Sequence, residues 1–75
     1  MVARLRGVRA KELIRALEKA GFDIMRQKGS HVVMHDAGTD KTVVVPLHSV
    51  ELPRWLLKKI IKDAGLTEDE FRSLI

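Results

Sequence analysis

Residues 22–47 read FDIMRQKGSHVVMHDAGTDKTVVVPL, and this stretch decides the fold. It divides into three short runs that are rich in apolar residues, and two turn-rich segments separate them. The runs are Phe22–Lys28, His31–His35 and Thr42–Leu47, and the first segment is the tight turn of Lys28, Gly29 and Ser30. Strands joined by turns this short pair antiparallel, so the stretch predicts a three-stranded antiparallel sheet.

Alternation within these runs predicts which side chains share a face of the sheet. In the second run Val32 and Met34 fall on one face, and His31, Val33 and His35 fall on the other. In the first run we expect one face to carry Phe22, Ile24 and Arg26, and the opposite face to carry Asp23, Met25 and Gln27. Pro46 lacks the N–H that an interior strand needs, which predicts an edge strand or a strand end.

Helical periodicity flanks the sheet on both sides. Residues 10–20 place apolar side chains at the spacing of one buried helix face and are followed by Gly21, while residues 53–64 do the same and are followed by Gly65. Thr67 and Glu70 form a capping-box pattern, which predicts a short third helix ending near Leu74.

The predicted fold is therefore α+β with the order α-β-β-β-α and a short C-terminal helix. Each long helix has one apolar stripe, so both are expected on one face of the sheet, and the other face is left open to solvent. This is the architecture of double-stranded-RNA-binding domains (dsRBD). A chain of 75 residues predicts a single domain over residues 1–75.

Composition narrows the possible functions. The absence of cysteine excludes disulfides, thiolate metal sites and a cysteine nucleophile. No run of about 20 apolar residues and no signal peptide is visible, so we expect a soluble, cytoplasmic protein with no membrane partner. The net charge is +4, and residues 1–35 carry eight Lys or Arg against three Asp or Glu. A basic first half favours a polyanionic partner such as nucleic acid.

The histidines are the first residues to test for metal binding. His31 and His35 face the same way on the second strand, but four residues of strand separate them by about 13 Å. Both cannot bind one ion directly, so the sequence predicts neither a metal nor a cofactor. We expect His35 to be a solvent-exposed strand end.

His31 has a different setting, because it follows Gly29 and Ser30 directly. A glycine turn lets backbone come close to a phosphate, and the charges of Arg26 and Lys28 could help to hold that phosphate. Histidine has an ordinary pKa of about 6.5 and can move a proton at neutral pH, while RNA brings its own 2′-hydroxyl nucleophile. His31 is thus a candidate catalytic residue for RNA cleavage; the alternative is a histidine that only caps the hairpin.

Several motifs in order resemble the HicA-type (YcfA-like) toxins. They are KELI at 11–14, LEKAGF at 17–22, RQKGSH at 26–31, VPLH at 45–48 and IIKDAGL at 60–66. The resemblance implies a dsRBD-like fold, metal-independent cleavage of mRNA, a HicB-type antitoxin as partner, and His31 as the catalytic histidine. His48 matches a histidine of the family and could be a second acid or base, a phosphate contact, or a residue that makes only a local hydrogen bond.

Other residues could contact RNA as well. Lys58 and Lys62 lie off the apolar stripe of the second long helix, together with Trp55, which could stack on a base or on the antitoxin. For Trp55 we instead expect partial burial under the Leu52-Pro53 turn. Two alternatives to the ribonuclease remain: a non-catalytic RNA-binding module of the same fold, and an interaction protein whose basic face serves only an acidic partner.

Overall fold

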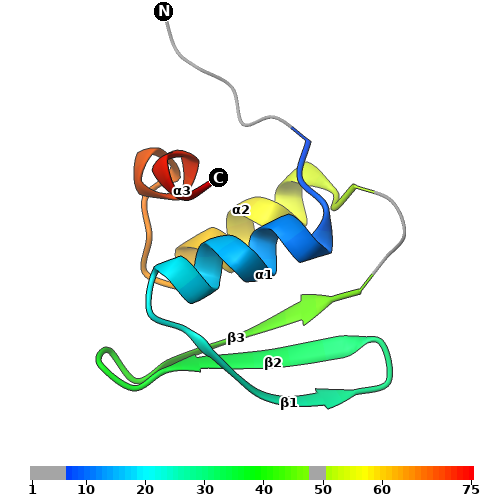
Figure 1. Ribbon diagram of the computed structural model, residues 1–75. Helices are drawn as coiled ribbons and strands as arrows, with labels where there is room; N and C mark the ends of the chain where they lie inside the picture. The colour runs from blue at the N-terminus through cyan, green and yellow to red at the C-terminus, as the bar shows by residue number, and fades with distance from the viewer. Residues whose placement is uncertain (1–6, 48–50) are drawn as a thin grey trace, which may run out of the picture.

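The computed structural model describes residues 7–47 and 51–75. Its elements follow the predicted order (Figure 1): α1 (Ala10–Lys19), β1 (Asp23–Lys28), β2 (His31–Asp36), β3 (Lys41–Pro46), α2 (Arg54–Asp63) and α3 (Glu68–Leu74). The α+β class and the three-stranded sheet are therefore confirmed, with small differences at the ends of elements. No helix in these two ranges is long and apolar enough to cross a lipid bilayer.

The three strands form an antiparallel meander in the order β1-β2-β3, with β2 in the centre. His31 pairs with Lys28 on one side and with Pro46 on the other, so the start of β2 is flanked by the end of β1 and the end of β3. Pro46 is both the last residue of its strand and part of an edge strand, as its missing N–H predicted.

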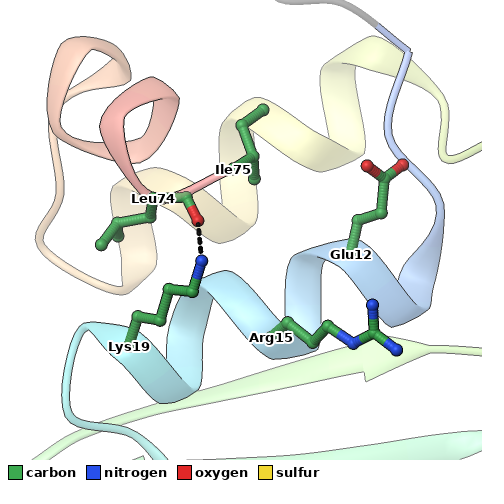
Figure 2. Close-up of a pocket in the computed structure, with 5 residues that line it drawn as sticks. All are labelled: Glu12, Arg15, Lys19, Leu74 and Ile75. Carbon is green, nitrogen blue, oxygen red and sulfur yellow. Dashed lines mark hydrogen bonds between the residues drawn. The ribbon is translucent and has the colours of Figure 1, made fainter.

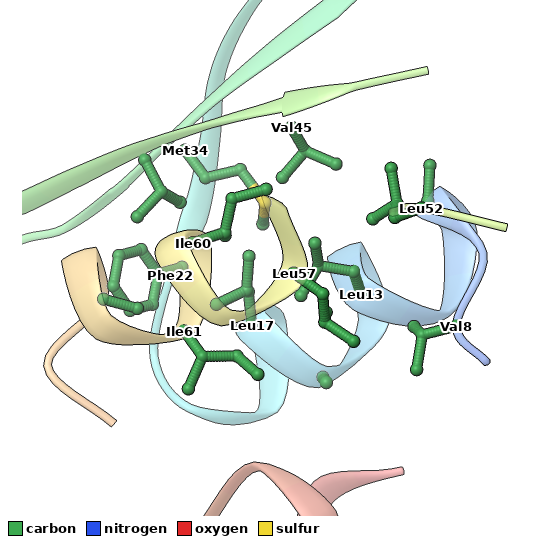
Figure 3. Packing of buried hydrophobic residues seen from close by; sticks show 14 of the residues in the cluster. Val8, Leu13, Leu17, Phe22, Met34, Val45, Leu52, Leu57, Ile60 and Ile61 are labelled. Carbon is green, nitrogen blue, oxygen red and sulfur yellow. The ribbon is translucent and has the colours of Figure 1, made fainter. Parts of the chain in front are cut away.

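Both long helices lie on one face of the sheet, and α3 packs on the far side of the helices (Figure 1). The core between the layers contains Val32 and Met34 from β2, which are 2% and 0% exposed, and Val43 and Val45 from β3. The helices add mainly Leu13, Leu17, Leu57, Ile60 and Ile61 (Figure 3). Alternation in β2 and β3 thus places every second residue under the helices.

Strand β1 contributes nothing to this core, since all six of its residues are exposed. Phe22, directly before β1, is 2% exposed, whereas Ile24 is 50% exposed. Ile24 pairs with Met34 and so belongs to the helix side of the sheet, but half of its surface remains accessible. The reason is the position of β1 at the edge of the sheet, beyond the strands that supply the buried valines and Met34.

A capping box begins α3, and glycines follow the ends of α1 and α2, as the sequence predicted. The backbone N–H of Glu70 donates to Thr67 Oγ1 at 3.1 Å, and the Thr67 N–H donates to Glu70 Oε1 at 2.9 Å, which completes the capping box of α3. Gly21 and Gly65 follow α1 and α2 with φ of 109° and 77°, values that residues with a Cβ rarely adopt.

Candidate functional site at the β1–β2 turn

Cross-strand pairing defines the composition of the sheet face that carries His31. Residues opposite each other in an antiparallel pair share a face, so Lys28 and Pro46 lie beside His31, and Arg26 and Val44 lie beside Val33 in the next row. This face points away from Val32 and Met34 and hence from the helices (Figure 1). No described helix covers it, so the face is open to a large ligand.

The turn before His31 is as tight as a hairpin allows. Lys28 pairs directly with His31, which leaves Gly29 and Ser30 as a two-residue loop. Gly29 has φ of 59° and Ser30 has no positive φ, the signs of a type II′ turn, which favours glycine at its first central position. A Cβ on Gly29 would meet nothing within 4 Å, so backbone conformation, and not lack of space, requires glycine here.

The turn is also anchored to β3. The Leu47 N–H donates to the Ser30 carbonyl oxygen at 2.6 Å, directly beside the pairing of His31 with Pro46. The His31 side chain therefore projects from a backbone that is paired with a neighbouring strand on each side. A rigid backbone of this kind favours catalysis, because precise placement of the reacting groups is a large part of catalysis.

A β-bulge sets the positions of the cations in β1. The register shifts between Ile24 and Arg26, so that Ile24 pairs with Met34, Arg26 pairs with Val33, and Met25 is the extra residue. Strict alternation predicted Ile24 and Arg26 on one face, and this expectation is wrong because the bulge inserts one residue between them. Arg26 and Lys28 remain on the face of His31, about 7 Å apart along the strand.

The His31 side chain is exposed at this face. Within residues 7–47 and 51–75, no hydrogen bond or ion pair holds its ring. An imidazole in this position can take or give a proton to a ligand without first breaking an internal contact.

His35 has a partner, in contrast to His31. Its Nε2 lies 2.9 Å from Asp40 Oδ1, and its side chain is 27% exposed, so the expectation of a freely exposed strand end is only partly right. Asp36 organises the same loop by accepting from the Gly38 N–H at 2.9 Å and from the Thr39 hydroxyl at 3.0 Å. This end of β2 is thus a hydrogen-bonded turn at the opposite end of the strand from His31.

The structure separates the other proposed RNA contacts from His31. Lys58 and Lys62 are exposed on α2, which lies on the helix side of the sheet, whereas Arg26, Lys28, Gly29 and Ser30 surround His31 on or beside the open face. Lys58 Nζ lies 3.9 Å from Glu68 Oε2. His48 falls outside the described residues.

The Trp55 side chain is 67% exposed, so the expectation of partial burial under the Leu52-Pro53 turn is wrong. The cause is its position in the helix. Helix α2 begins at Arg54 and buries Leu57, Ile60 and Ile61, and Trp55 falls on the opposite side. The helical spacing of the buried residues was the available signal, and it outweighs the local turn.

Metal-ligating side chains do not cluster in the described ranges: no group of three or more His, Asp or Glu residues there could hold an ion. The chemistry that this face offers rests on one imidazole, two nearby cations and the backbone of a tight turn.

A hollow that the sequence did not predict lies between α1 and the end of α3 (Figure 2). Its volume is about 160 Å³, and it is lined by Glu12, Arg15, Lys19, Leu74 and Ile75. Lys19 Nζ donates to the Leu74 carbonyl oxygen at 3.1 Å across it. It lies in the helix layer, apart from His31, and it opens beside α1 where the four-residue spacing of Arg15 and Lys19 puts two cations on one side.

A comparison with known protein families identifies the chain's relatives. A family model described as "HicA toxin of bacterial toxin-antitoxin" matches residues 10–66, which is more than half of the chain and includes α1, the whole sheet and α2. No curated protein matches the chain.

Proposed function

The chain belongs to the HicA toxin family of bacterial toxin–antitoxin systems, and on that premise we propose that it is a ribonuclease that cleaves mRNA without a metal ion. One observation carries the proposal: the exposed His31 ring stands next to a tight Gly-Ser turn, with Arg26 and Lys28 on the same open face. A proton-transferring group beside a phosphate-binding surface is what cleavage by the RNA's own 2′-hydroxyl requires.

In the proposed reaction His31 accepts the proton of the 2′-hydroxyl as the 2′-oxygen attacks the adjacent phosphorus. The bond between phosphorus and the 5′-oxygen of the next nucleotide breaks, and that oxygen takes a proton from the histidine or from water. The products are a 2′,3′-cyclic phosphate and a 5′-hydroxyl. Arg26, Lys28 and the backbone N–H groups of the turn hold the phosphate and offset its growing negative charge.

The decisive variant is His31→Ala. General acid–base catalysis is typically worth about 10²- to 10⁴-fold in rate, so we expect RNA cleavage to fall by that amount or more. A metal chelator should not change the rate, and a substrate with 2′-deoxyribose at the cleaved position should resist. The rate on a labelled RNA, with analysis of the product ends, measures all three.

Thermal melting is the control for this variant. The His31 ring is exposed and forms no hydrogen bond or ion pair within the described residues, so the melting temperature of His31→Ala should be close to that of the wild type. Full activity in the variant would remove His31 from the mechanism. A wild-type protein that binds RNA but never cleaves it would instead favour the non-catalytic RNA-binding module.

For the antitoxin we propose a HicB-type protein that covers the face of His31. The site is shallow and open, so an inhibitor that excludes RNA has to cover His31 and the cations beside it. The adjacent gene product should co-purify with the toxin, and a structure of the complex should show His31 buried by it. A partner seated only on residues 66–75, with His31 still open to RNA, would contradict this.

A further inference from the structure

One side of α2 combines an exposed aromatic ring with cations. Trp55, Lys58, Lys59 and Lys62 follow the spacing i, i+3, i+4 and i+7, so they form one continuous face, which we call the α2 stripe. All three lysines are exposed, and Trp55 at 67% is the most exposed large apolar side chain among the described residues. The buried residues of α2 lie on its other side, so packing in the core does not explain why a tryptophan stands here.

The ion pairs of the stripe are weak competitors for a polyanion. Lys59 Nζ lies 2.7 Å from Asp63 Oδ2, and Lys58 Nζ lies 3.9 Å from Glu68 Oε2, but all four side chains are 45% exposed or more. Surface pairs of this kind contribute little, and a bound phosphate can replace either carboxylate. Lys62 forms no ion pair with any residue in the described ranges.

The composition of the stripe favours nucleic acid over a protein partner. Tryptophan is common at both kinds of interface, but lysine is depleted where proteins bind proteins. Surfaces that bind single-stranded nucleic acid combine positive charge along the backbone with aromatic rings on which bases stack. Three lysines along one helix face with a tryptophan at its start match the second description.

The stripe begins at the end of the molecule that carries the His31 turn. The start of α2, the end of β3 and the β1–β2 turn all lie at the same end in Figure 1. Pro46 on the edge strand β3 pairs with His31, and α2 packs against β3. A strand of RNA that crosses this edge can therefore meet both His31 on the open face and Trp55 on the helix side.

We propose that the α2 stripe is a second binding surface for unpaired RNA, on which Trp55 stacks against a base that flanks the cleaved phosphate. This inference rests on the proposed function for the identity of the RNA as substrate. Stacking needs an accessible base face, so the surface selects single strands over duplex.

The tryptophan itself provides the measurement, because the chain contains only one. In full-length His31→Ala protein, in which we expect cleavage to be at least about 10²-fold slower, a short oligouridylate should quench the tryptophan fluorescence as it binds. An oligomer of the same length and charge that lacks bases should bind, by the anisotropy of an attached dye, with little quenching. A duplex of the same length should also leave the fluorescence nearly unchanged.

Substitution of Trp55 gives the second readout. Base stacking on an aromatic residue is worth about 1–3 kcal/mol, so in the same background Trp55→Ala should weaken oligouridylate binding by about 5- to 150-fold. Trp55→Phe should recover a large part of that loss. Ile75→Ala is the matched control, since it removes a 37% exposed apolar side chain at the hollow beside α1, outside both the stripe and the open face, and it should leave the affinity unchanged.

Two results would overturn the inference: fluorescence that does not change when the oligomer is bound, or an affinity of Trp55→Ala within twofold of the parent. Fluorescence that responds to the antitoxin but not to RNA would assign the stripe to the protein partner instead. Failure of the proposed function looks different, because a wild-type protein that cleaves no RNA can still show Trp55-dependent binding. Active cleavage without Trp55 dependence rejects the stripe alone.

Discussion

Strand β2 has two faces with opposite properties. On the helix side, Val32 and Met34 are 2% and 0% exposed and belong to the hydrophobic core. On the open side, His31 is exposed, and its row contains Lys28 from β1 and Pro46 from β3. Side chains alternate between the two faces of a strand, so one residue can stabilise the core while its neighbour serves the candidate site.

Met34→Ala is the strongest test of the difference between the two faces of β2. This change deletes a fully buried side chain in the centre of the sheet, and we expect it to lower the free energy of unfolding by about 2–5 kcal/mol. Urea denaturation measures the loss. Val33→Ala, one residue away on the open face, should cost much less, and equal losses for the two variants would show that the two faces do not differ in their contribution to stability.

A chain of this size has little stability to spare, so Met34→Ala could fail to fold. Met34→Leu keeps the volume of the core and should cost less than about 1.5 kcal/mol. RNA cleavage per folded molecule should be unchanged in Met34→Leu, because the side chain points away from His31.

Gly29→Ala tests how far the open face depends on the conformation of the turn. A side chain at φ of 59° costs about 1–2 kcal/mol, although the added Cβ meets nothing within 4 Å. The variant should therefore lose that much stability in urea and lose cleavage activity as the turn relaxes. Gly29→Asn is the control, because asparagine tolerates this conformation better, and it should retain more of both; equal losses in the two variants would show that the conformation of the turn does not matter.

We expect the smallest change from Lys28→Ala, which alters the salt dependence of RNA binding at the open face. Each phosphate contact contributes about −0.7 to the slope of log affinity against log salt for single-stranded RNA, so Lys28→Ala should reduce the steepness by about that amount. Titration of a labelled oligomer at several salt concentrations measures the slope. Lys19→Ala, on the hollow beside α3, should leave it unchanged, and an unchanged slope in Lys28→Ala would remove this residue from the RNA contact.

Periodicity in the sequence predicted most of the fold because burial on one side imposes it. The apolar spacing of α1 and α2 and the alternation of β2 gave elements that differ from the structure only near their ends. The bulge at Met25 could not be predicted, because an extra residue in an exposed edge strand leaves no mark on the apolar pattern. The prediction for Trp55 is wrong because the spacing of the helix, and not the turn before it, orients this side chain.

The part of the candidate site that could be predicted consists of residues that are close together in the sequence. Gly29, Ser30 and His31 are adjacent in the chain, and pairing across a tight turn brings Lys28 beside them. Lys58 and Lys62 are separated from His31 because the helices and the sheet form different layers. The positive charge of a lysine does not indicate in which layer it lies. Asp40, which pairs with His35, has a φ of 57°, and nothing in the local sequence pattern indicated either this conformation or the contact.

Because all six residues of β1 are exposed, we expect this strand to open at a lower temperature than the core. A strand with no buried residue is held mainly by its hydrogen bonds to β2, so it can detach while the helices and the other two strands stay folded. Its amides should exchange with solvent deuterium before those of β3. Detachment would carry Arg26, Lys28 and the first half of the turn away from His31, so the temperature at which the proposed site fails is set by this one edge strand and lies below the melting point of the core.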